Sequence, residues 1–453
     1  MTGGRQRATA KHGESIRRGN IQSGHRSHAA TLILAWESST FNRMEADEAD
    51  ALAGSSAGGI GRRPLRCAHY LPNVRLESGG VARAVLDWCT VLAGRGLEMT
   101  LITTDPADIP PSWLNAGRGG GRTPRAVVIP PPEGYLRKFG RGAVETIVHL
   151  FETTDLVHLH APWLVGNRQI AAIARRLGRP YVLTPHGMLD DWSMSQRGMK
   201  KRVFLRTIGR RFLEGATMIH CTAAAEAEQA SKWFSTPRVT VLPYICDLSP
   251  FQQLPGVSIA RQTFQALNRP GLKILFLGRL HEKKGVDLLI LAAAELKRQS
   301  VPFVLLIVGP DSAGYQARLE ALASELGLGQ DVLFLGFVGG VERVSLLQAA
   351  DVLALPTHQE NFGLVLTEAL ACGTPVVTTR GVDIWQEVQS AGGLIVDRTA
   401  ASVAGALREI ASDPAAARAR GDRGRRWALE YLDADKLGAA YEDLYRRVVA
   451  SSA

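Results

Sequence analysis

The chain has 453 residues, 45% of them hydrophobic and 21% charged, which is typical of a folded protein long enough for two domains with separate cores. Its five cysteines are scattered without a Cys-x-x-Cys pair, which argues against a disulfide framework or a zinc site and favours a reducing, cytoplasmic compartment. The net charge of +10 would suit an anionic partner, although an arginine-rich proteome would give the same figure. No apolar run approaches the ~18–20 residues of a membrane span.

Residues 1–63 are predicted to be a disordered N-terminal extension. Gly, Ser, Thr, Arg and Ala dominate this segment, and residues 1–43 hold seven Lys or Arg against two Glu, a net charge of +5. Such a segment cannot bury enough apolar surface to offset the entropy of ordering. Met44 is an alternative start, in which case the first 43 residues would not belong to the protein.

Residues 64–247 show alternating strand and helix patterns, which predict a first Rossmann-like domain. The run Leu65–Leu71 indicates a strand, Gly79-Gly80 opens a helix over 81–93, and Leu97–Thr103 indicates the next strand. Residues 104–125, rich in Gly and Pro, predict a surface loop. The alternation continues with strands at 126–129, 156–160, 181–184, 218–221 and 239–242, and helices at 137–151, 166–177 and 223–233. Because crossovers are right-handed, this predicts a doubly wound parallel sheet.

His186 follows one of these strands in the sequence Pro185-His186-Gly187-Met188. Ligands of such sheets bind beyond the carboxyl ends of the strands, so His186 is a candidate site residue. The alternative is a loop histidine tied to the backbone. We interpret His158 and His160, at the end of the preceding strand, as structural, with His160 as a second candidate for the cleft.

Residues 197–213 predict a basic amphipathic helix. One ridge carries Arg202, Arg206 and Arg210, and another carries Phe204, Ile208 and Phe212. Such a helix would suit an anionic membrane surface or a phosphate-bearing acceptor. The alternative is a solvated basic face over an apolar one.

A linker is predicted over 248–270, followed by a second Rossmann-like domain over 271–433 and a last helix over 434–453 that crosses back to the first domain. The strands of the second series are predicted at 272–277, 303–308, 332–335, 351–355 and 375–377. The first turn of this series, from Gly278 to Gly285, carries Arg279 and Lys284 between a strand end and a helix start. A forked Arg and a flexible Lys there can clamp a diphosphate.

The unit 351–377 carries two carboxylates around a helix that is predicted to be buried because it is apolar nearly all round. Glu360 precedes this helix, and Glu368 lies inside it, where a carboxylate needs a partner. Three amides would be free at the helix N-terminus, which suits a phosphate. They belong to Phe362, Gly363 and Leu364. Two carboxylates flanking an anion site fit the hydroxyls of a nucleotide-sugar; the alternative is a loop cap and an internally satisfied glutamate.

Together these motifs resemble family 4 of the retaining glycosyltransferases, group 1 glycosyltransferases with the α/β GT-B fold of two doubly wound Rossmann-like domains facing each other across a cleft. The resemblance covers residues 64–450 and is strongest in Glu360-x7-Glu368, then in Gly278-Arg279-Leu280 with Lys284-Gly285. Pro185 to Leu189 is similar to members that build exopolysaccharide and lipopolysaccharide. One departure is Tyr244-Ile245-Cys246-Asp247, where many members have Asn-Gly-Val-Asp.

The resemblance implies a role for each motif. Glu368 would hold the ribose hydroxyls, and Glu360 the donor hexose. The diphosphate would lie against the Gly278 turn through Arg279 and Lys284. His186 would face the donor sugar, and Gly79-Gly80 would lie near phosphate and acceptor.

The resemblance also implies a reaction without a metal or cofactor, in which a UDP- or GDP-linked sugar is a substrate. Arg and Lys would neutralise the leaving diphosphate, whose departing oxygen would act as the base. We therefore expect a retaining hexosyltransferase acting on a saccharide or lipid-linked saccharide in surface polysaccharide assembly, in the cytoplasm or on the inner membrane face. Rival functions are a nucleotide-sugar epimerase or hydrolase and a non-catalytic membrane adaptor. The aromatic content of 6% argues against nucleic-acid binding.

Overall fold

The computed structural model describes residues 63–115, 122–134, 137–196, 198–235, 238–311 and 314–452, without the side chains of Ser78 and Ile208. The chain divides into two units, of which Arg63–Ala453 is the one described below. The predictions of disorder and of an alternative start at Met44 lie outside the described residues. Arg63, which we had assigned to the extension, forms an ion pair with Asp155 (2.6 Å).

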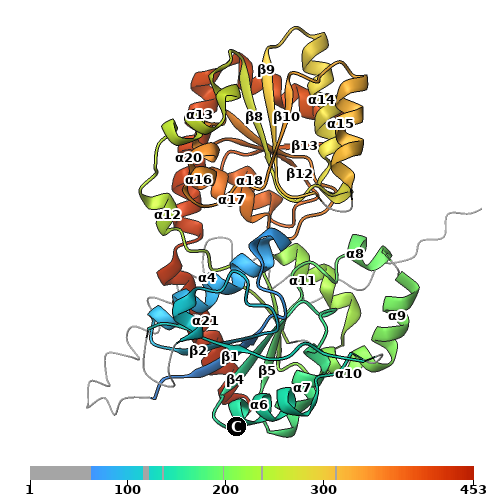
Figure 1. Ribbon diagram of the computed structural model, residues 1–453, viewed down its shortest axis with the longest axis vertical. Coiled ribbons are helices and arrows are strands. Elements are labelled where there is room, and N and C mark those ends of the chain that lie inside the picture. Colours follow the sequence, from blue (N-terminus) through green and yellow to red (C-terminus); the bar gives the residue numbers. More distant parts are fainter. Residues whose placement is uncertain are drawn as a thin grey trace, which may run out of the picture. The chain divides into compact units, whose positions relative to one another are not determined.

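The first half of this unit forms a seven-stranded parallel sheet in the order β3-β2-β1-β4-β5-β6-β7 (Figure 1). Its strands are short runs of apolar residues that are buried because helices cover the sheet. They are β1 Arg66–Tyr70, β2 Glu98–Thr103, β3 Arg125–Val128, β4 Leu156–His160, β5 Tyr181–Thr184, β6 Met218–Cys221 and β7 Val239–Val241.

Helices connect these strands, as the alternating pattern predicts. They are η1 Leu76–Ser78, α4 Gly80–Gly94, α5 Pro111–Leu114, α6 Arg141–Glu152, α7 Asn167–Arg176, α8 Asp191–Ser195, α9 Gly198–Arg206, α10 Ile208–Glu214, α11 Ala224–Ala230 and η2 Ser231–Trp233. The predicted loop 104–125 thus contains one short helix, α5, and residues 116–121 of that loop lie outside the described part.

The second half forms a six-stranded parallel sheet in the order β10-β9-β8-β11-β12-β13. The strands are β8 Leu272–Leu277, β9 Phe303–Val308, β10 Val332–Gly336, β11 Val352–Leu355, β12 Val376–Thr379 and β13 Leu394–Val396. The helices are α12 Ser249–Gln252, α13 Ser258–Thr263, η3 Gln265–Asn268, η4 Glu282–Lys284, α14 Val286–Arg298, α15 Tyr315–Glu325, α16 Gly340–Ala349, α17 Leu364–Ala371, α18 Trp385–Ser390, α19 Ala400–Ser412, α20 Pro414–Tyr431 and α21 Ala434–Ala450. The prediction of two parallel sheets with connecting helices is confirmed.

The last helix, α21, packs on the first sheet although the second sheet precedes it in the chain. It contacts α4 and β4, and Figure 1 shows it in red beside the blue and green elements of that sheet. Tyr441 and Tyr445 on α21 are fully buried there. The first sheet therefore obtains part of its core from the C-terminal end of the chain.

The prediction of one continuous basic helix over 197–213 is wrong. The segment forms α9 and α10, which are separated at Thr207, a residue with φ −113° and ψ −96° that lies outside helical geometry. Phe212 is buried, whereas Met199 and Val203 on α9 are exposed by 80% and 57%. The apolar side chains of this segment are therefore divided between the core and the surface.

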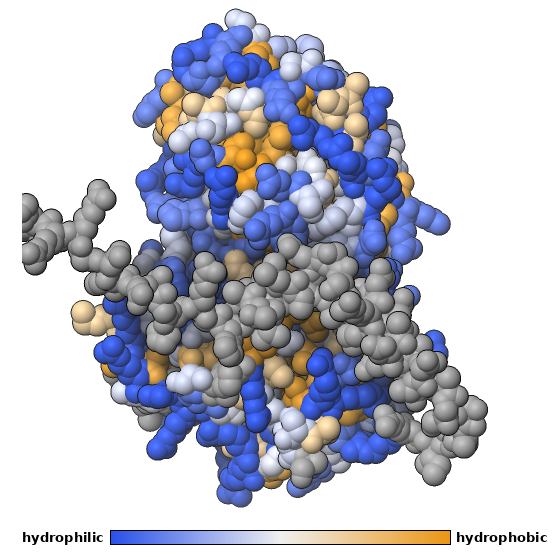
Figure 2. Space-filling model, turned by 180° about the vertical axis from the view of Figure 1, so that it is seen from behind, coloured by the Kyte–Doolittle hydropathy of each residue, from blue (hydrophilic) through white to orange (hydrophobic). Residues whose placement is uncertain are grey.

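The face of the molecule in Figure 2 is mainly hydrophilic, with apolar residues in separate groups. The large apolar side chains exposed in the described part of the chain include Leu76, Leu114, Phe337 and Val341 in addition to Met199 and Val203. No helix among the described residues is long and apolar enough to cross a membrane.

Candidate donor-binding site

Glu360 lies in the loop between β11 and α17, where backbone bonds hold it in place. Its amide donates to the Gly381 carbonyl (2.7 Å), and its carbonyl accepts from the Asp383 amide (2.9 Å). Its carboxylate forms an ion pair with Lys284. Gly363 then turns the chain into α17 with φ +68°, a conformation that favours glycine. The structure thus brings together two residues that the sequence assigned to one site from 76 positions apart.

The turn that carries Lys284 is packed directly against the Glu360 loop. Gly285 has φ +71°, and a Cβ there would collide with the Pro356 carbonyl. The Lys283 carbonyl accepts from the amide of His358 (2.8 Å) and from the hydroxyl of Thr357 (2.9 Å). The two partners of the ion pair therefore sit on one rigid frame at the carboxyl ends of β8 and β11.

Glu368 is 8% exposed on α17, and its carboxylate forms an ion pair with Arg343 on α16. The sequence indicated that this buried carboxylate needs a partner, but we did not name Arg343. The sequence offered one signal for this partner, which is that Arg343 follows the glycine-rich stretch at the start of α16. An arginine fork can hold one carboxylate oxygen while the other stays available to a ligand hydroxyl.

The glycine pair at the start of α4 reaches two other elements of the site. A Cβ added to Gly79 (φ +118°) would lie 3.4 Å from Arg279 Nε, and one added to Gly80 would lie 3.3 Å from a methyl group of Leu364, the first residue of α17. Arg279 is exposed. The N-termini of α4 and α17 and the exposed guanidinium therefore meet, which is a favourable setting for an anion.

Two predicted donor-binding residues, Phe362 and Gly278, are packed within the protein. Phe362 is 1% exposed, and its ring packs edge-on against Tyr244 with centroids 5.1 Å apart. Gly278 follows β8; its amide donates to the Val308 carbonyl (2.9 Å), and a Cβ on Gly309 would collide with the Gly278 carbonyl. Phe362 is therefore held by packing of its ring, and the Gly278 backbone by its close contact with Val308 and Gly309.

His186 has a left-handed backbone (φ +54°) and is buried, and both of its ring nitrogens have partners. Nε2 lies 3.0 Å from His160 Nδ1, and Nδ1 lies 2.5 Å from the Tyr244 hydroxyl. Burial lowers the His186 pKa to about 3, so the ring is neutral near pH 7. The imidazole is therefore held by the protein and is not presented as a free base.

A group of buried polar residues that we did not predict lies next to His186. Glu226 accepts hydrogen bonds from the amides of Gly187 (2.7 Å) and Thr222 (2.7 Å), and the Asn361 side chain lies 3.0 Å from the Thr222 hydroxyl. Burial raises the pKa of Glu226 and raises that of Asp383 to about 8. These contacts join the loop after β5 to the Glu360 loop, and their long sequence separation left no local signal.

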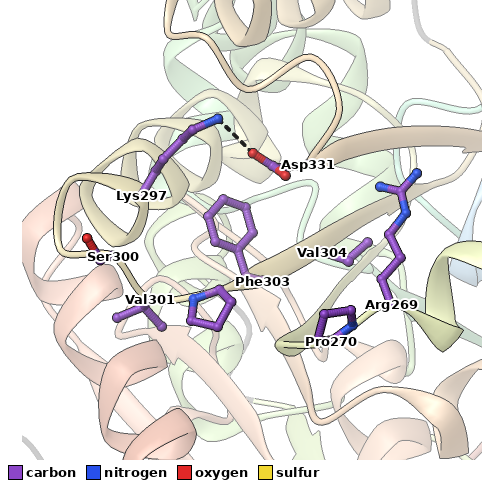
Figure 3. Close-up of a pocket in the computed structure, with 9 residues that line it drawn as sticks. Arg269, Pro270, Lys297, Ser300, Val301, Phe303, Val304 and Asp331 are labelled. Carbon is purple, nitrogen blue, oxygen red and sulfur yellow. Dashed lines mark hydrogen bonds and ion pairs between the residues drawn. The ribbon is translucent and has the colours of Figure 1, made fainter.

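A separate cavity of about 470 Å³ lies at the amino ends of β8 and β9, the edge opposite the loops described above (Figure 3). Its wall includes the Phe303 ring, the Arg269 side chain and the ion pair between Lys297 and Asp331 (2.9 Å). Ligands of doubly wound sheets bind at the carboxyl ends of the strands. This cavity is therefore not part of the candidate site.

The comparisons with known proteins agree on the kind of protein. The family described as "Glycosyl transferase 4-like domain" matches residues 79–244, and the family described as "Glycosyl transferases group 1" matches residues 261–427. A Kineococcus radiotolerans protein named D-inositol 3-phosphate glycosyltransferase is 30% identical over 409 residues, which cover 83% of this chain and 92% of that protein. The chain belongs to the group 1, family 4 glycosyltransferases.

Other relatives of this glycosyltransferase carry the same name. The Segniliparus rotundus D-inositol 3-phosphate glycosyltransferase is 29% identical over 362 residues, covering 73% of this chain and 79% of that protein. The two family matches, residues 79–244 and 261–427, include strands of both sheets, so the glycosyltransferase assignment does not rest on one half of the chain.

Solved structures establish the fold of the glycosyltransferase. Sucrose-phosphate synthase from Thermosynechococcus elongatus matches with a TM-score of 0.67 and 24% identity, covering 86% of this chain and all of that one. Anabaena HepE in complex with UDP and glucose matches with a TM-score of 0.69 and 19% identity, covering 84% of this chain and all of that one. The predicted GT-B fold is confirmed.

Proposed function

We propose that this glycosyltransferase moves a hexose, with retention, from a UDP- or GDP-linked donor to a saccharide or lipid-linked saccharide. The observation that carries the proposal is the ion pair between Lys284 and Glu360 on a rigid frame. It places a cation and a carboxylate beside the helix start at Leu364, where a sugar diphosphate would need both. An epimerase or hydrolase would use the same donor, and the two are distinguished by whether a sugar acceptor is consumed.

The charged side chains at the carboxyl ends of the second sheet support a sugar-nucleotide donor bound along the loops that carry them. Lys284 and Arg279 would bind the diphosphate, with the amides at the starts of α17 and α4. Glu360 would hold hexose hydroxyls, and Glu368, already oriented by Arg343, would hold the ribose. As the sugar–phosphate bond breaks, negative charge grows on the diphosphate, and fixed cations stabilise that charge most in the transition state. These cations would take the place of a metal ion.

The acceptor has two candidates. Sequence similarity around Pro185 to Leu189 favours a saccharide of surface polysaccharide assembly. The curated relatives are instead named for D-inositol 3-phosphate, which favours a phosphorylated polyol. Both candidates are polyhydroxyl acceptors, and a panel containing each type would separate them.

A membrane contact through α9 and α10 would suit a lipid-linked acceptor. Met199 and Val203 are exposed on α9, and Lys200, Arg202 and Arg206 lie on the same short helix. Exposed apolar side chains among cations are suited to an anionic interface, which accepts both. This would place the enzyme on the cytoplasmic face of a membrane.

The donor is tested by ligand-induced stabilisation. UDP, GDP and their hexose conjugates are added singly, and the melting temperature is measured, because a ligand that binds the folded state raises it by mass action. The proposal expects one nucleotide series to stabilise the wild type and to fail with Lys284→Ala. Turnover of the stabilising donor is then followed with acceptor, with and without EDTA. If none of these donors stabilises the wild type, or if EDTA abolishes turnover, the proposal is wrong in that respect.

A further inference from the structure

Nine buried side chains form one continuous hydrogen-bonded chain between α21 and the candidate site. Five are histidines, three are tyrosines and one is a threonine. In order they are Tyr441, His220, Thr184, His158, Tyr445, His69, His160, His186 and Tyr244. They come from β1, β4, β5, β6, α21 and the two loops that follow β5 and β7.

Each step of the chain is within hydrogen-bond distance. From His220 onward the separations are 2.8 Å to Thr184, 2.8 Å to His158, 2.6 Å to Tyr445, 3.1 Å to His69, 3.0 Å to His160, 3.0 Å to His186 and 2.5 Å to Tyr244. Burial lowers the pKa of every one of these histidines, so all are neutral near pH 7. A neutral imidazole has one donor nitrogen and one acceptor nitrogen, so the chain must run in a single direction.

The carbonyl of Leu242 fixes that direction. It lies 2.9 Å from His220 Nε2 and can only accept, and the nearby Tyr441 hydroxyl donates to the Pro243 carbonyl (2.8 Å). His220 Nε2 therefore carries the proton, and Nδ1 accepts from the Thr184 hydroxyl. The Thr184 hydroxyl has then used its hydrogen, and its oxygen accepts from His158 Nε2. His158 Nδ1 in turn accepts from the Tyr445 hydroxyl.

The same reasoning continues beyond Tyr445. Its oxygen accepts from His69 Nε2, and His69 Nδ1 accepts from His160 Nε2. His160 Nδ1 then accepts from His186 Nε2, so His186 Nδ1 accepts from the Tyr244 hydroxyl. Every histidine of the chain is thereby the Nε2–H tautomer, and the His220 Nε2–H is shared between the Leu242 carbonyl and the Tyr441 oxygen.

We propose that Tyr445 on α21 is a positioning residue, which by joining the two parts of this chain fixes the tautomer of His186 and turns the Tyr244 hydroxyl hydrogen toward it. The Tyr244 hydroxyl in turn lies 3.3 Å from the Asn361 side chain, on the loop that carries Glu360. The importance of this for turnover rests on the proposed function, whereas the tautomers do not.

Three members of the chain, His69, His158 and His160, also have the residue type and proximity of a metal site. Their lone pairs, however, are already used. His158 Nδ1 accepts from Tyr445, His69 Nδ1 from His160, and His160 Nδ1 from His186. A metal ion would have to break all three bonds, so the hydrogen-bonded chain is the better account.

The test is nitrogen NMR of the full chain labelled with ¹⁵N-histidine, in which protonated and unprotonated ring nitrogens give separate signals. The wild type is expected to show Nε2–H for all five histidines. In Tyr445→Phe, His69 Nε2–H would be a buried donor without an acceptor, which is costlier than a bare acceptor nitrogen. His69, His160 and His186 are therefore expected to reverse to Nδ1–H, while His158 and His220 keep Nε2–H.

Tyr441→Phe is the matched control, because the same hydroxyl is removed from the same helix at the end that Leu242 fixes. The Tyr441 hydroxyl donates to the Pro243 carbonyl (2.8 Å), so its loss leaves all five tautomers unchanged. The proposal is overturned if the wild type shows Nδ1–H at His69, His160 or His186, and this result does not depend on any variant folding. It is also overturned if Tyr445→Phe keeps the wild-type pattern, or if added Zn²⁺ shifts the His69, His158 and His160 signals together.

Turnover provides the second readout. With the donor identified, Tyr445→Phe is expected to lower kcat by roughly ten- to a hundredfold, because small misplacements near reacting groups carry that cost, while Tyr441→Phe stays near wild type. A reversed tautomer pattern with unchanged kcat would overturn the positioning role alone. A wild type that binds no nucleotide-sugar would instead refute the proposed function and leave the tautomer assignment standing.

Discussion

The buried histidines predict that the protein loses stability steeply in mild acid. Burial lowers the pKa of His69 and His186 to about 3 and that of His220 to about 4, and lowers those of His158 and His160 well below the usual value. In the unfolded chain each would titrate near 6.5. The unfolded state therefore binds more protons, so this contribution is complete above about pH 6.5 and is lost as the pH falls toward the folded pKa values.

The magnitude follows from the number of protons. Five histidines would remove about 6 kcal/mol between pH 6 and pH 5, since each unfolded imidazole becomes almost fully protonated in that interval. Buried carboxyl groups act in the opposite sense. Burial raises the pKa of Asp383 to about 8, that of Asp87 to about 6, and also that of Glu226. Each of these carboxyl groups offsets up to about 1.4 kcal/mol of the stability that the histidines lose. The expected net loss is about 2–4 kcal/mol, a large part of a typical total of ~5–15 kcal/mol.

Urea unfolding at pH 7, 6 and 5 measures this loss. His220→Asn removes one of the five groups and should reduce the loss between pH 6 and 5 by about 1.2 kcal/mol, whatever its effect on stability at pH 7. His149→Gln is the control, because His149 is an exposed histidine on α6 and does not belong to the buried group of five. A wild type that loses less than about 1 kcal/mol over this interval would refute the assignment of five neutral buried histidines.

Three further outcomes are expected at the site and on the surface. Lys284→Ala should remove roughly 2–4 kcal/mol of transition-state stabilisation, as the loss of one fixed electrostatic donor does, and kcat/KM within twofold of wild type would contradict this. Glu368→Gln should mainly raise KM for the donor and weaken calorimetric binding of the nucleoside diphosphate, whereas Glu360→Gln should mainly lower kcat; the reverse pattern would exchange their roles. Changing Met199 and Val203 together to Ser should weaken binding to anionic vesicles and spare turnover of a soluble acceptor, and equal vesicle binding would argue against a membrane contact.

Much of the fold could be predicted because parallel sheets have a simple sequence pattern. The central strands β8 and β9 have the predicted bounds, 272–277 and 303–308, since strands buried on both faces are continuous apolar runs. The edge strand β13, with three residues, was missed because so short a run carries little pattern. The interruption at Thr207 was missed for a related reason: nothing in the helical periodicity there changes.

The sequence predicts which single residues belong to the candidate site, but not which of them pair with residues on other elements. Lys284 and Glu360 each stand beside a strand end, which is visible in sequence. The pairing of Glu368 with Arg343 depends on how α16 packs on α17, and burial of a carboxylate shows only that a partner is needed. His158 and His160 share a face of β4 by their spacing, but the register that sets His69 beside His158 arises only in the assembled sheet.

The position of α21 has a consequence for how the protein is made. The sheet formed by residues 66–241 receives Tyr441 and Tyr445 from a helix that is synthesised roughly two hundred residues later. Because translation adds about 5–20 residues per second, the sheet face that carries the histidines stays without α21 for some 10–40 s. A nascent chain therefore leaves the ribosome with its first half unfinished, and a stop codon ahead of residue 434 would harm the half that had already been translated. We expect chaperones to retain such fragments, because the surface that α21 normally covers stays exposed to solvent.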